Sequence, residues 1–337
     1  MIPPERLPLL ITGVTGVAGF NALAHFRARY PGQVVATRGI LSKLDGDDVV
    51  GLAIEDRDGL AQLFREHGIR SVLNTTGNCA LKSCELDPVM SHRLNVVSAD
   101  NLAAVARAFG ARLVHLSSDL VFSGVGTGEY VETDPVDPVT VYGKTMVGGE
   151  AAVFALCPEA AILRISLPMG PSCNGHAGAI DWIQSRFRAG RPATLYFDEV
   201  RSCTYVADLN HVFEFFLATA AAGLYHLGGP RPITLYQIAQ IVNRIGGYEP
   251  HLLKGCPRHD AGPIPPRAGN VSMNSAKLHT LMGGDPCRPW PLGDELFPSD
   301  RHWHFERPAD EDNGPERLIA RLYSYLETFI DTGAGLR

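Results

Sequence analysis

The chain has 337 residues, 45% apolar and 20% charged, which is enough apolar material to bury the cores of about two domains. Lys and Arg number 30 against 36 Asp and Glu, a net charge of -6 with both signs interspersed, which excludes a dedicated nucleic-acid binder. The seven cysteines are odd in number and lack CxxC spacing, so we expect no disulfide framework, no metal site and a reducing, cytoplasmic location.

The first elements in chain order are a strand, a glycine turn and a helix between residues 7 and 29. Residues 7–26 carry no charged side chain over 20 residues, a length typical of a membrane span. Pro8 and three glycines interrupt this stretch, so we predict no membrane partner. Further strands are expected over residues 33–38, 49–55, 71–76, 112–118 and 161–166. Helices are expected over residues 57–67, 87–109, 141–156, 178–189, 208–222, 234–246 and 314–331.

Alternation of buried strands with long helices predicts an α/β protein with a Rossmann-type doubly wound parallel sheet. After residue 166 the pattern loosens, and proline-rich loops separate shorter helices. We therefore expect a dinucleotide-binding domain over residues 1–166 and a smaller C-terminal α/β substrate lobe over 167–337, with the chain interleaving between the two.

The glycine turn is the clearest motif, because Gly13, Gly16 and Gly19 stand between a strand and a helix. The first glycine permits the tight turn, the second lets a pyrophosphate approach, and the third lets the helix pack on the strand. Thr15 and Val17 lie beside them at the helix N-terminus, which favours phosphate groups. The motif predicts cofactor binding, and the alternative is a simple strand-to-helix turn.

The end of the second strand bears on the choice of cofactor. Arg38 stands there, and no acidic residue follows until Asp45. An acid would bind the 2′-hydroxyl of NAD, whereas an arginine accommodates the 2′-phosphate of NADP. We therefore predict NADP(H) rather than NAD(H), the alternative being that Arg38 is an ordinary solvated side chain.

The glycine turn and several later segments resemble those of a known enzyme family. The spacing GxxGxxG is typical of extended short-chain dehydrogenases/reductases. Residues 115–124, HLSSDLVFSG, are similar to the stretch STDYVFDG of dTDP-4-dehydrorhamnose reductases, and residues 141–150, VYGKTMVGGE, resemble their YGKTKLEGE. Residues 72–77, 198–209 and 223–229 also look like landmarks of that family, in the same order. The resemblance spans about residues 7–283 and implies the same fold.

The resemblance also implies catalytic residues. In this family a Ser or Thr, a Tyr and a Lys four residues later move the proton while hydride passes to or from nicotinamide. The matching positions here are Ser118, Tyr142 and Met146. A thioether carries no charge, so Met146 can neither lower the pKa of the phenol nor donate to a ribose. Lys144 lies about 200° from Tyr142 around the helix and is no replacement.

Other positions follow from the family frame. The resemblance implies further cofactor contacts from these five residues: Glu55, Asn74, Thr75, Thr76 and Ser166. Asn95 matches an asparagine that supports the active-site backbone. Arg201 and Arg267 match positions from which relatives approach a sugar nucleotide, although either could instead pair with an acid.

Two functions remain open at the level of the sequence. The first is a cytoplasmic NADP(H)-dependent reductase, or an epimerase-type enzyme, acting on a nucleotide-activated sugar. The second is a dinucleotide-binding regulatory protein, similar to the regulatory β subunit of methionine adenosyltransferase, which Met146 favours. Homodimers are common among relatives, so a homodimer is a possible partner arrangement, and the sequence leaves the oligomeric state open.

Overall fold

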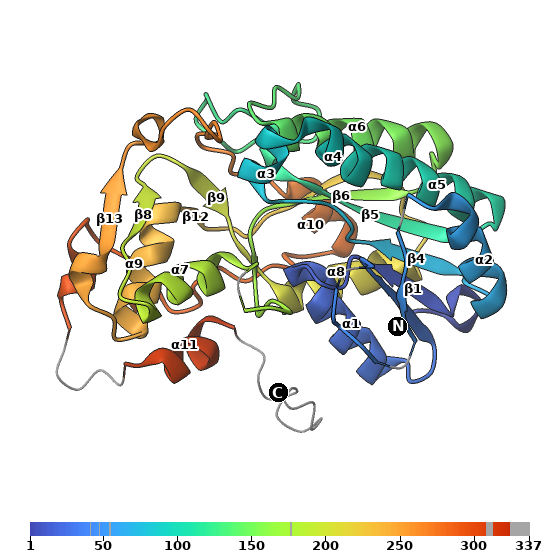
Figure 1. Cartoon of the computed structure of the whole chain (residues 1–337), viewed down its shortest axis with the longest axis horizontal. Helices are drawn as coiled ribbons and strands as arrows, with labels where there is room; N and C mark the ends of the chain where they lie inside the picture. Colours follow the sequence, from blue (N-terminus) through green and yellow to red (C-terminus); the bar gives the residue numbers. More distant parts are fainter. Residues whose placement is uncertain (41, 47, 54, 176, 308–312, 324–337) are drawn as a thin grey trace.

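A seven-stranded parallel sheet forms the centre of the computed structural model, which describes residues 1–40, 42–46, 48–53, 55–175, 177–307 and 313–323 (Figure 1). The strand order is β11-β6-β5-β4-β1-β2-β3. The strands are β1 (Leu9–Thr12), β2 (Val34–Arg38), β3 (Val49–Gly51), β4 (Ser71–Asn74), β5 (Arg112–Ser118), β6 (Ala161–Ile165) and β11 (Gly223–Leu227). The predicted Rossmann-type fold is confirmed. Because the order reverses between β1 and β4, a crevice for a ligand is expected at their carboxyl ends.

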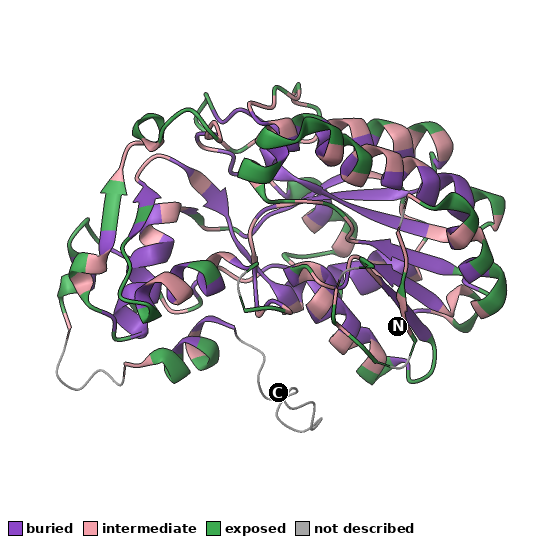
Figure 2. Cartoon of the chain, viewed as in Figure 1, coloured by how far each residue is buried: buried purple, intermediate pink, exposed green. Residues whose placement is uncertain are grey.

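Helices cover both faces of this sheet, and its strands are largely buried (Figure 2). Successive strand residues alternate between the two cores. On one face Leu9 and Ile11 pack against α1 (Val17–Arg29) and α8 (Val206–Ala218). On the other face Leu10 packs against α2 (Arg57–His67), α5 (Ser98–Ala108) and α6 (Val141–Leu156). The uncharged stretch at the N-terminus is thus strand, turn and helix, as predicted. Within the described residues no helix is both long and apolar enough to cross a membrane.

Local signals account for several helix ends. Asp56 begins α2 by accepting a hydrogen bond from the Gly59 N–H at 3.0 Å, and Gly68 ends it in the left-handed region at φ 61°. Thr140 begins α6 by accepting from the Gly143 N–H at 2.9 Å. The strand predicted over 49–55 stops at Gly51, because the next residues turn into the cap of α2.

The helix predicted over residues 87–109 is in fact three segments. They are α4 (Pro88–His92), a π-helical turn η2 (Arg93–Val97) and α5, preceded by a short α3 (Leu81–Leu86). The π turn inserts one extra residue, a feature that a 3.6-residue pattern does not reveal. Asn95 lies in this turn, and its Oδ1 accepts a hydrogen bond from the Asn78 N–H at 2.8 Å.

The second lobe contains three small strand pairs and its own core, centred on α9 (Leu235–Ile245). The pairs join β7 (Pro168–Met169) to β10 (Thr204–Tyr205), β8 (Ala193–Tyr196) to β13 (Leu253–Cys256), and β9 (Val200–Ser202) to β12 (Pro232–Thr234). The remaining α-helices are α7 (Ala179–Arg188), α10 (Ala276–Met282) and α11 (Pro315–Leu322). Short 3-10 turns are η1 (Pro4–Arg6), η3 (Asp119–Val121), η4 (Pro250–Leu252), η5 (Arg258–Ala261), η6 (Asp294–Leu296) and η7 (Trp303–Phe305). The helix predicted over 314–331 ends at Leu322, and its last part, from residue 324, lies outside the described residues.

The chain crosses between the lobes more than once. After building β7 to β10 it returns as α8, which packs on α1, and as β11, which pairs in parallel with β6. Figure 1 shows α8 and α10 on the side of the large sheet although they follow the first strands of the second lobe. The region after residue 166 therefore contributes to both cores.

Candidate functional site

Two of the three motif glycines are required by the packing of the protein itself. Gly13 has φ +70°, and a Cβ there would lie 2.7 Å from the backbone of Thr75. A Cβ on Gly19 would lie 2.4 Å from Thr75 Oγ1 and 2.5 Å from the Gly13 carbonyl oxygen. These contacts hold α1 close to the ends of β1 and β4, which is the close approach expected of the motif.

Gly16 differs, because nothing in the protein requires it to be glycine. It begins α1 at φ -79°, a conformation that any residue adopts, and a Cβ there would meet only the Gly13 oxygen at 3.7 Å. Its outer side is open at the N-terminus of a 13-residue helix, with Thr15 partly exposed and Val17 buried beside it. A ligand that approaches the backbone explains the glycine, and a pyrophosphate fits the chemistry of a helix N-terminus.

Arg38 is the last residue of β2 and lies at the carboxyl edge of the sheet, as the glycine turn does. Its Nη2 lies 3.1 Å from Asp45 Oδ1, while its buried Nε has no hydrogen-bond partner among the described residues. The Asp45 side chain is 83% exposed, so this ion pair is screened by water and holds the guanidinium weakly. An unpaired N–H donor and a weakly held positive charge are the features expected of an arginine that donates hydrogen bonds to a phosphate.

The side chains after β4 serve mainly to shape the turn. Asn74 Oδ1 accepts hydrogen bonds from Thr12 Oγ1 at 2.7 Å and from the Thr76 N–H at 3.1 Å. Thr75 Oγ1 donates to the Thr12 carbonyl oxygen at 2.6 Å. Asn74 and Thr75 thus tie β1 to β4 from within. The buried Thr76 Oγ1 has no hydrogen-bond partner within the described part of the chain, so of the two threonine hydroxyls it is the one left to bond with another group.

Glu55 is also engaged by the protein. Its Oε1 lies 2.9 Å from Arg93 Nε, and its carbonyl oxygen accepts a hydrogen bond from Asn101 Nδ2 at 2.7 Å. These contacts join Glu55 to η2, which also carries Asn95, and to α5.

Ser118 and Tyr142 come together at the carboxyl end of β5 and the first turn of α6. Both are buried, and the Ser118 side chain lies close enough to the phenol to act on its pKa. Burial raises the pKa of Tyr142 above its usual value, and the nearby Cys79 thiol raises it further, whereas the Ser118 hydroxyl and the charge of Arg201 oppose these effects. The phenol consequently stays protonated over the whole neutral range.

Met146 lies one turn after Tyr142 and belongs to the same apolar cluster. The side chain is 6% exposed and packs in a cluster that contains Cys84, Leu120, Val121, Phe122 and Tyr142. Lys144 is exposed, as the helix geometry predicts. The chain thus has an apolar group at the position where the family resemblance implies a lysine.

Sequence reasoning missed Asp119, the residue that organises this end of the sheet. Asp119 is fully buried, and its two oxygens accept hydrogen bonds from Arg201 Nη2 at 2.8 Å and Nε at 2.9 Å. Ser166 Oγ donates to Asp119 Oδ2 at 2.5 Å. Arg201 and Ser166, predicted to contact substrate and cofactor, are therefore both bound to Asp119. A buried acid directly after a strand needs a partner, which is the signal that could have revealed it.

Arg267 is held more loosely than Arg201. Its Nη1 lies 3.7 Å from Glu199 Oε2, and its guanidinium stacks on the ring of Tyr196 at 4.6 Å. The buried Nε has no partner in the described residues, and the side chain is 23% exposed. Of the two arginines, Arg267 is the one with a donor left for a ligand.

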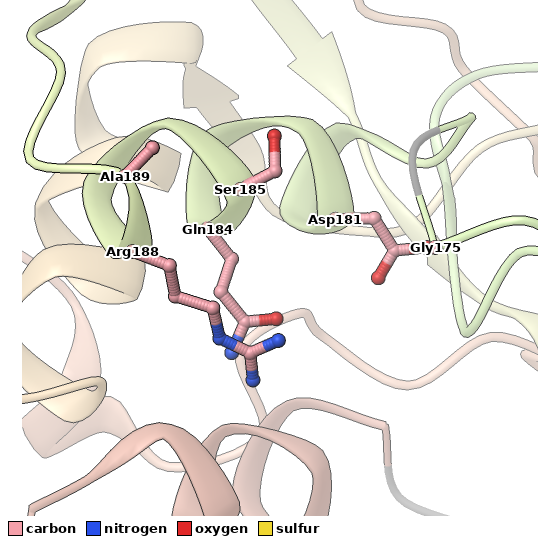
Figure 3. A pocket seen from close by; sticks show the side chains of 6 residues that line it. All are labelled: Gly175, Asp181, Gln184, Ser185, Arg188 and Ala189. Carbon is pink, nitrogen blue, oxygen red and sulfur yellow. The ribbon is translucent and has the colours of Figure 1, made fainter.

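A cavity of about 380 Å³ lies elsewhere, along α7 of the second lobe (Figure 3). The side chains of Asp181, Gln184 and Arg188 point from one side of the helix, while Ser185 and Ala189 point from the other. Asp181 is bound through Oδ1 to the Tyr323 hydroxyl at 2.9 Å, so this side faces the end of α11. None of the predicted site residues lines the cavity.

Comparison with known proteins bears directly on this arrangement. Residues 7–293 match the family model described as the RmlD substrate binding domain. The chain belongs to this family. The resemblance drawn from the motifs is thereby confirmed, and the match includes the glycine turn, Ser118, Tyr142 and both arginines.

The relatives and solved structures agree with this membership. The dTDP-4-dehydrorhamnose reductase of Mycolicibacterium smegmatis is 26% identical over 287 residues, 84% of this chain and 82% of that protein. A dTDP-4-dehydrorhamnose reductase of Bacillus anthracis, solved in complex with NADP, has a TM-score of 0.71 at 20% identity, covering 84% of this chain and 94% of that one. WbmG of Bordetella bronchiseptica, solved with NAD and UDP, has a TM-score of 0.69 at 20% identity, covering 83% and 90%. At these identities the two structures establish the fold alone.

Proposed function

We propose that the chain is an oxidoreductase that reduces a keto group on a nucleotide-activated sugar with NADP(H). The observation that carries the proposal is the Ser118–Tyr142 pair at the carboxyl edge of the sheet that also carries the open glycine turn. The names of the curated relatives support the reaction class and the substrate class. Because solved neighbours hold NADP in one case and NAD in another, they support a nicotinamide dinucleotide in general, and Arg38 is the argument for NADP(H).

In the proposed mechanism Tyr142 donates its phenolic proton to the carbonyl oxygen of the substrate. The bound dihydronicotinamide would supply the hydride that reduces the carbonyl carbon, so that the product is an alcohol. The Ser118 oxygen orients the phenol, and rotation of its hydrogen from Asp119 to the substrate oxygen would add a second hydrogen bond. Gly16, Arg38 and Thr76 would hold the cofactor, and Arg267 would bind the diphosphate of the substrate.

Met146 leaves Tyr142 without the neighbouring charge that the family resemblance implies. A lysine there would lower the pKa of the phenol, which would make it a stronger proton donor in reduction and a more readily formed phenolate in oxidation. Burial raises the pKa of Tyr142, so the phenol is protonated at neutral pH but is a weaker acid. Reduction is the direction that uses this protonated form.

The test is an assay of the purified protein in two steps. NADPH binding is followed by fluorescence, and consumption of NADPH is then followed at 340 nm with a dTDP-linked 4-keto-6-deoxyhexose. Turnover supports the reductase, whereas tight binding without turnover on any 4-keto sugar nucleotide supports the regulatory protein that Met146 also allows. The comparisons add no support to that second function. Lack of NADPH and NADH binding would overturn both.

The same preparation tests two further parts of the proposal. A cytoplasmic location predicts recovery in the soluble fraction of the source cell after lysis. A homodimer predicts a particle of twice the mass of the 36.4 kDa chain in light scattering, and a monomer would contradict it.

Gly16→Val is expected to weaken NADPH binding at least ~10-fold, about 1.4 kcal/mol, without a change in thermal stability. Among the described residues a Cβ at position 16 meets only the Gly13 oxygen, at 3.7 Å, so we expect a bound ligand to be affected more than the fold. The matched control is Gly284→Val, since a Cβ at Gly284 also meets nothing within 4 Å. Equal NADPH affinity in both variants would contradict a pyrophosphate at Gly16.

Arg38→Ala is expected to weaken NADPH binding by ~10- to 100-fold, the value of about 1.5–3 kcal/mol for hydrogen bonds to a charged group. NADH binding should change little, because NADH lacks the 2′-phosphate. Fluorescence titration with both cofactors measures the difference, with Arg65→Ala on the exposed side of α2 as the control. An equal loss for both cofactors would argue against recognition of the 2′-phosphate.

A further inference from the structure

A buried series of polar contacts runs from the second lobe to the Ser118–Tyr142 pair. Arg201 lies in β9 and is 5% exposed, and its Nε and Nη2 bind the two oxygens of the fully buried Asp119 at 2.9 Å and 2.8 Å. Its remaining nitrogen, Nη1, lies 3.4 Å from Glu199 Oε1. Each of the three guanidinium nitrogens of Arg201 therefore already contacts a carboxylate, so none is left to bind a substrate alone.

The contacts continue from Asp119 to the phenol. Ser118 Oγ donates to Asp119 Oδ1 at 3.1 Å, and the same oxygen accepts from the Leu120 N–H at 3.1 Å. The Ser118 side chain in turn lies beside the Tyr142 phenol and acts on its pKa. Because Asp119 accepts the hydrogen bond from Ser118, the orientation of the Ser118 hydroxyl depends on Asp119. Arg201 makes a bidentate contact with Asp119, which leaves the carboxylate little freedom to rotate.

The charge of Arg201 also acts on Tyr142. Position 146 is occupied by a buried thioether, so α6 offers no cation beside Tyr142. The charge of Arg201 acts on Tyr142 from the second lobe and opposes the rise in the pKa of the phenol that burial causes. Asp119 acts in the opposite sense and has the larger effect, and Cys79 also raises this pKa, so the pKa of Tyr142 depends on groups from η3, β9 and the segment after β4.

We infer that Arg201 is a positioning residue for the reaction: it holds Asp119 in place, and through Asp119 it orients the Ser118 side chain beside Tyr142. This inference rests on the proposed function. It assigns the two arginines of the second lobe different roles, since Arg267 keeps a donor for the substrate and Arg201 acts from behind the catalytic pair.

The test compares Arg201→Gln and Arg201→Lys with a matched buried pair. Arg164 binds Glu150 at 2.8 Å, and their side chains are 4% and 8% exposed. The side chains of Arg201 and Asp119 are similarly buried, at 6% and 0%. Within the described residues, no hydrogen bond or ion pair of Arg164 is with Ser118 or Tyr142. With the nucleotide sugar as substrate, Arg201→Gln should lower kcat by roughly 100-fold and leave KM almost unchanged. Arg201→Lys should recover part of kcat because it keeps the charge. Arg164→Gln should keep kcat at a temperature where circular dichroism shows that all variants are folded.

A second measurement needs no turnover. In protein labelled with ¹³C at tyrosine Cζ, the Tyr142 resonance is assigned by its loss in Tyr142→Phe. It should shift in Arg201→Gln and stay in place in Arg164→Gln. If Arg201→Gln does not fold, the double variant Asp119→Asn/Arg201→Gln removes both charges together and takes its place in both experiments.

The outcomes separate the inference from the function on which it rests. A wild-type protein that binds NADPH without turnover refutes the proposed reaction, and the Tyr142 resonance still decides the role of Arg201. A raised KM with unchanged kcat in Arg201→Gln would make Arg201 a substrate contact and overturn the inference. An unchanged Tyr142 resonance in a folded Arg201→Gln protein would overturn it as well.

Discussion

Replacing Tyr142 with Phe is expected to lower kcat for NADPH-dependent reduction by about 10²- to 10⁴-fold, the usual contribution of a positioned general acid. The phenyl ring keeps the packing of the buried cluster around Met146, so only the hydroxyl is lost. NADPH affinity should stay the same, because in the proposed mechanism Tyr142 donates to the substrate and the glycine turn holds the cofactor. Absorbance at 340 nm gives the rate, and fluorescence titration gives the affinity.

The control for this experiment is Tyr225→Phe. Tyr225 lies in β11, and its hydroxyl donates to the Ala222 carbonyl oxygen at 3.2 Å, away from Ser118. Its loss should leave the rate unchanged. Full activity in Tyr142→Phe would remove the phenol from the mechanism and leave Ser118 as the remaining candidate donor.

Replacing Arg164 with Met is expected to reduce the free energy of unfolding by about 3–5 kcal/mol, because it leaves a buried carboxylate without its partner. Arg164 binds Glu150 through Nε and Nη2, both at 2.8 Å, and both residues are buried between β6 and α6. Ser117 also donates to Glu150 Oε1. Unfolding in urea, followed by circular dichroism, measures the change.

The companion variant is Arg164→Met/Glu150→Leu. Removing both charges should restore much of the lost stability, since an apolar pair of similar volume often replaces a buried ion pair at little cost. If the single variant were as stable as the wild type, water would have to reach Glu150, contrary to its 6% exposure.

The fold and the glycine turn were predictable because their causes are local. Gly13 and Gly19 are fixed by contacts between neighbouring elements, and the strand periodicity follows from burial on both faces of a parallel sheet. In the structure Asp56 and Gly68 likewise set the ends of α2 by their own chemistry, a local signal of the same kind. Such signals lie within a few residues of the feature that they determine.

The charge network at the site was not predictable in the same way. Arg201 meets Asp119 across 82 residues of sequence, and nothing in either neighbourhood identifies the other as its partner. Asn74 and Thr75 could be recognised as belonging to the site, but not as side chains that hold β1 to β4. Their roles depend on which direction each side chain takes, and that is decided only when distant strands pair.

The path of β11 sets a limit on how this protein can be divided. A fragment that stops at residue 166 would lose β11 and leave one edge of β6 with a row of unpaired backbone groups, a surface that invites aggregation. It would also lose α8, and with it the apolar partner of α1 directly behind the glycine turn. Chimaeras that exchange substrate lobes between relatives therefore need to graft the separate segments around α8 and β11 and cannot use a single crossover point.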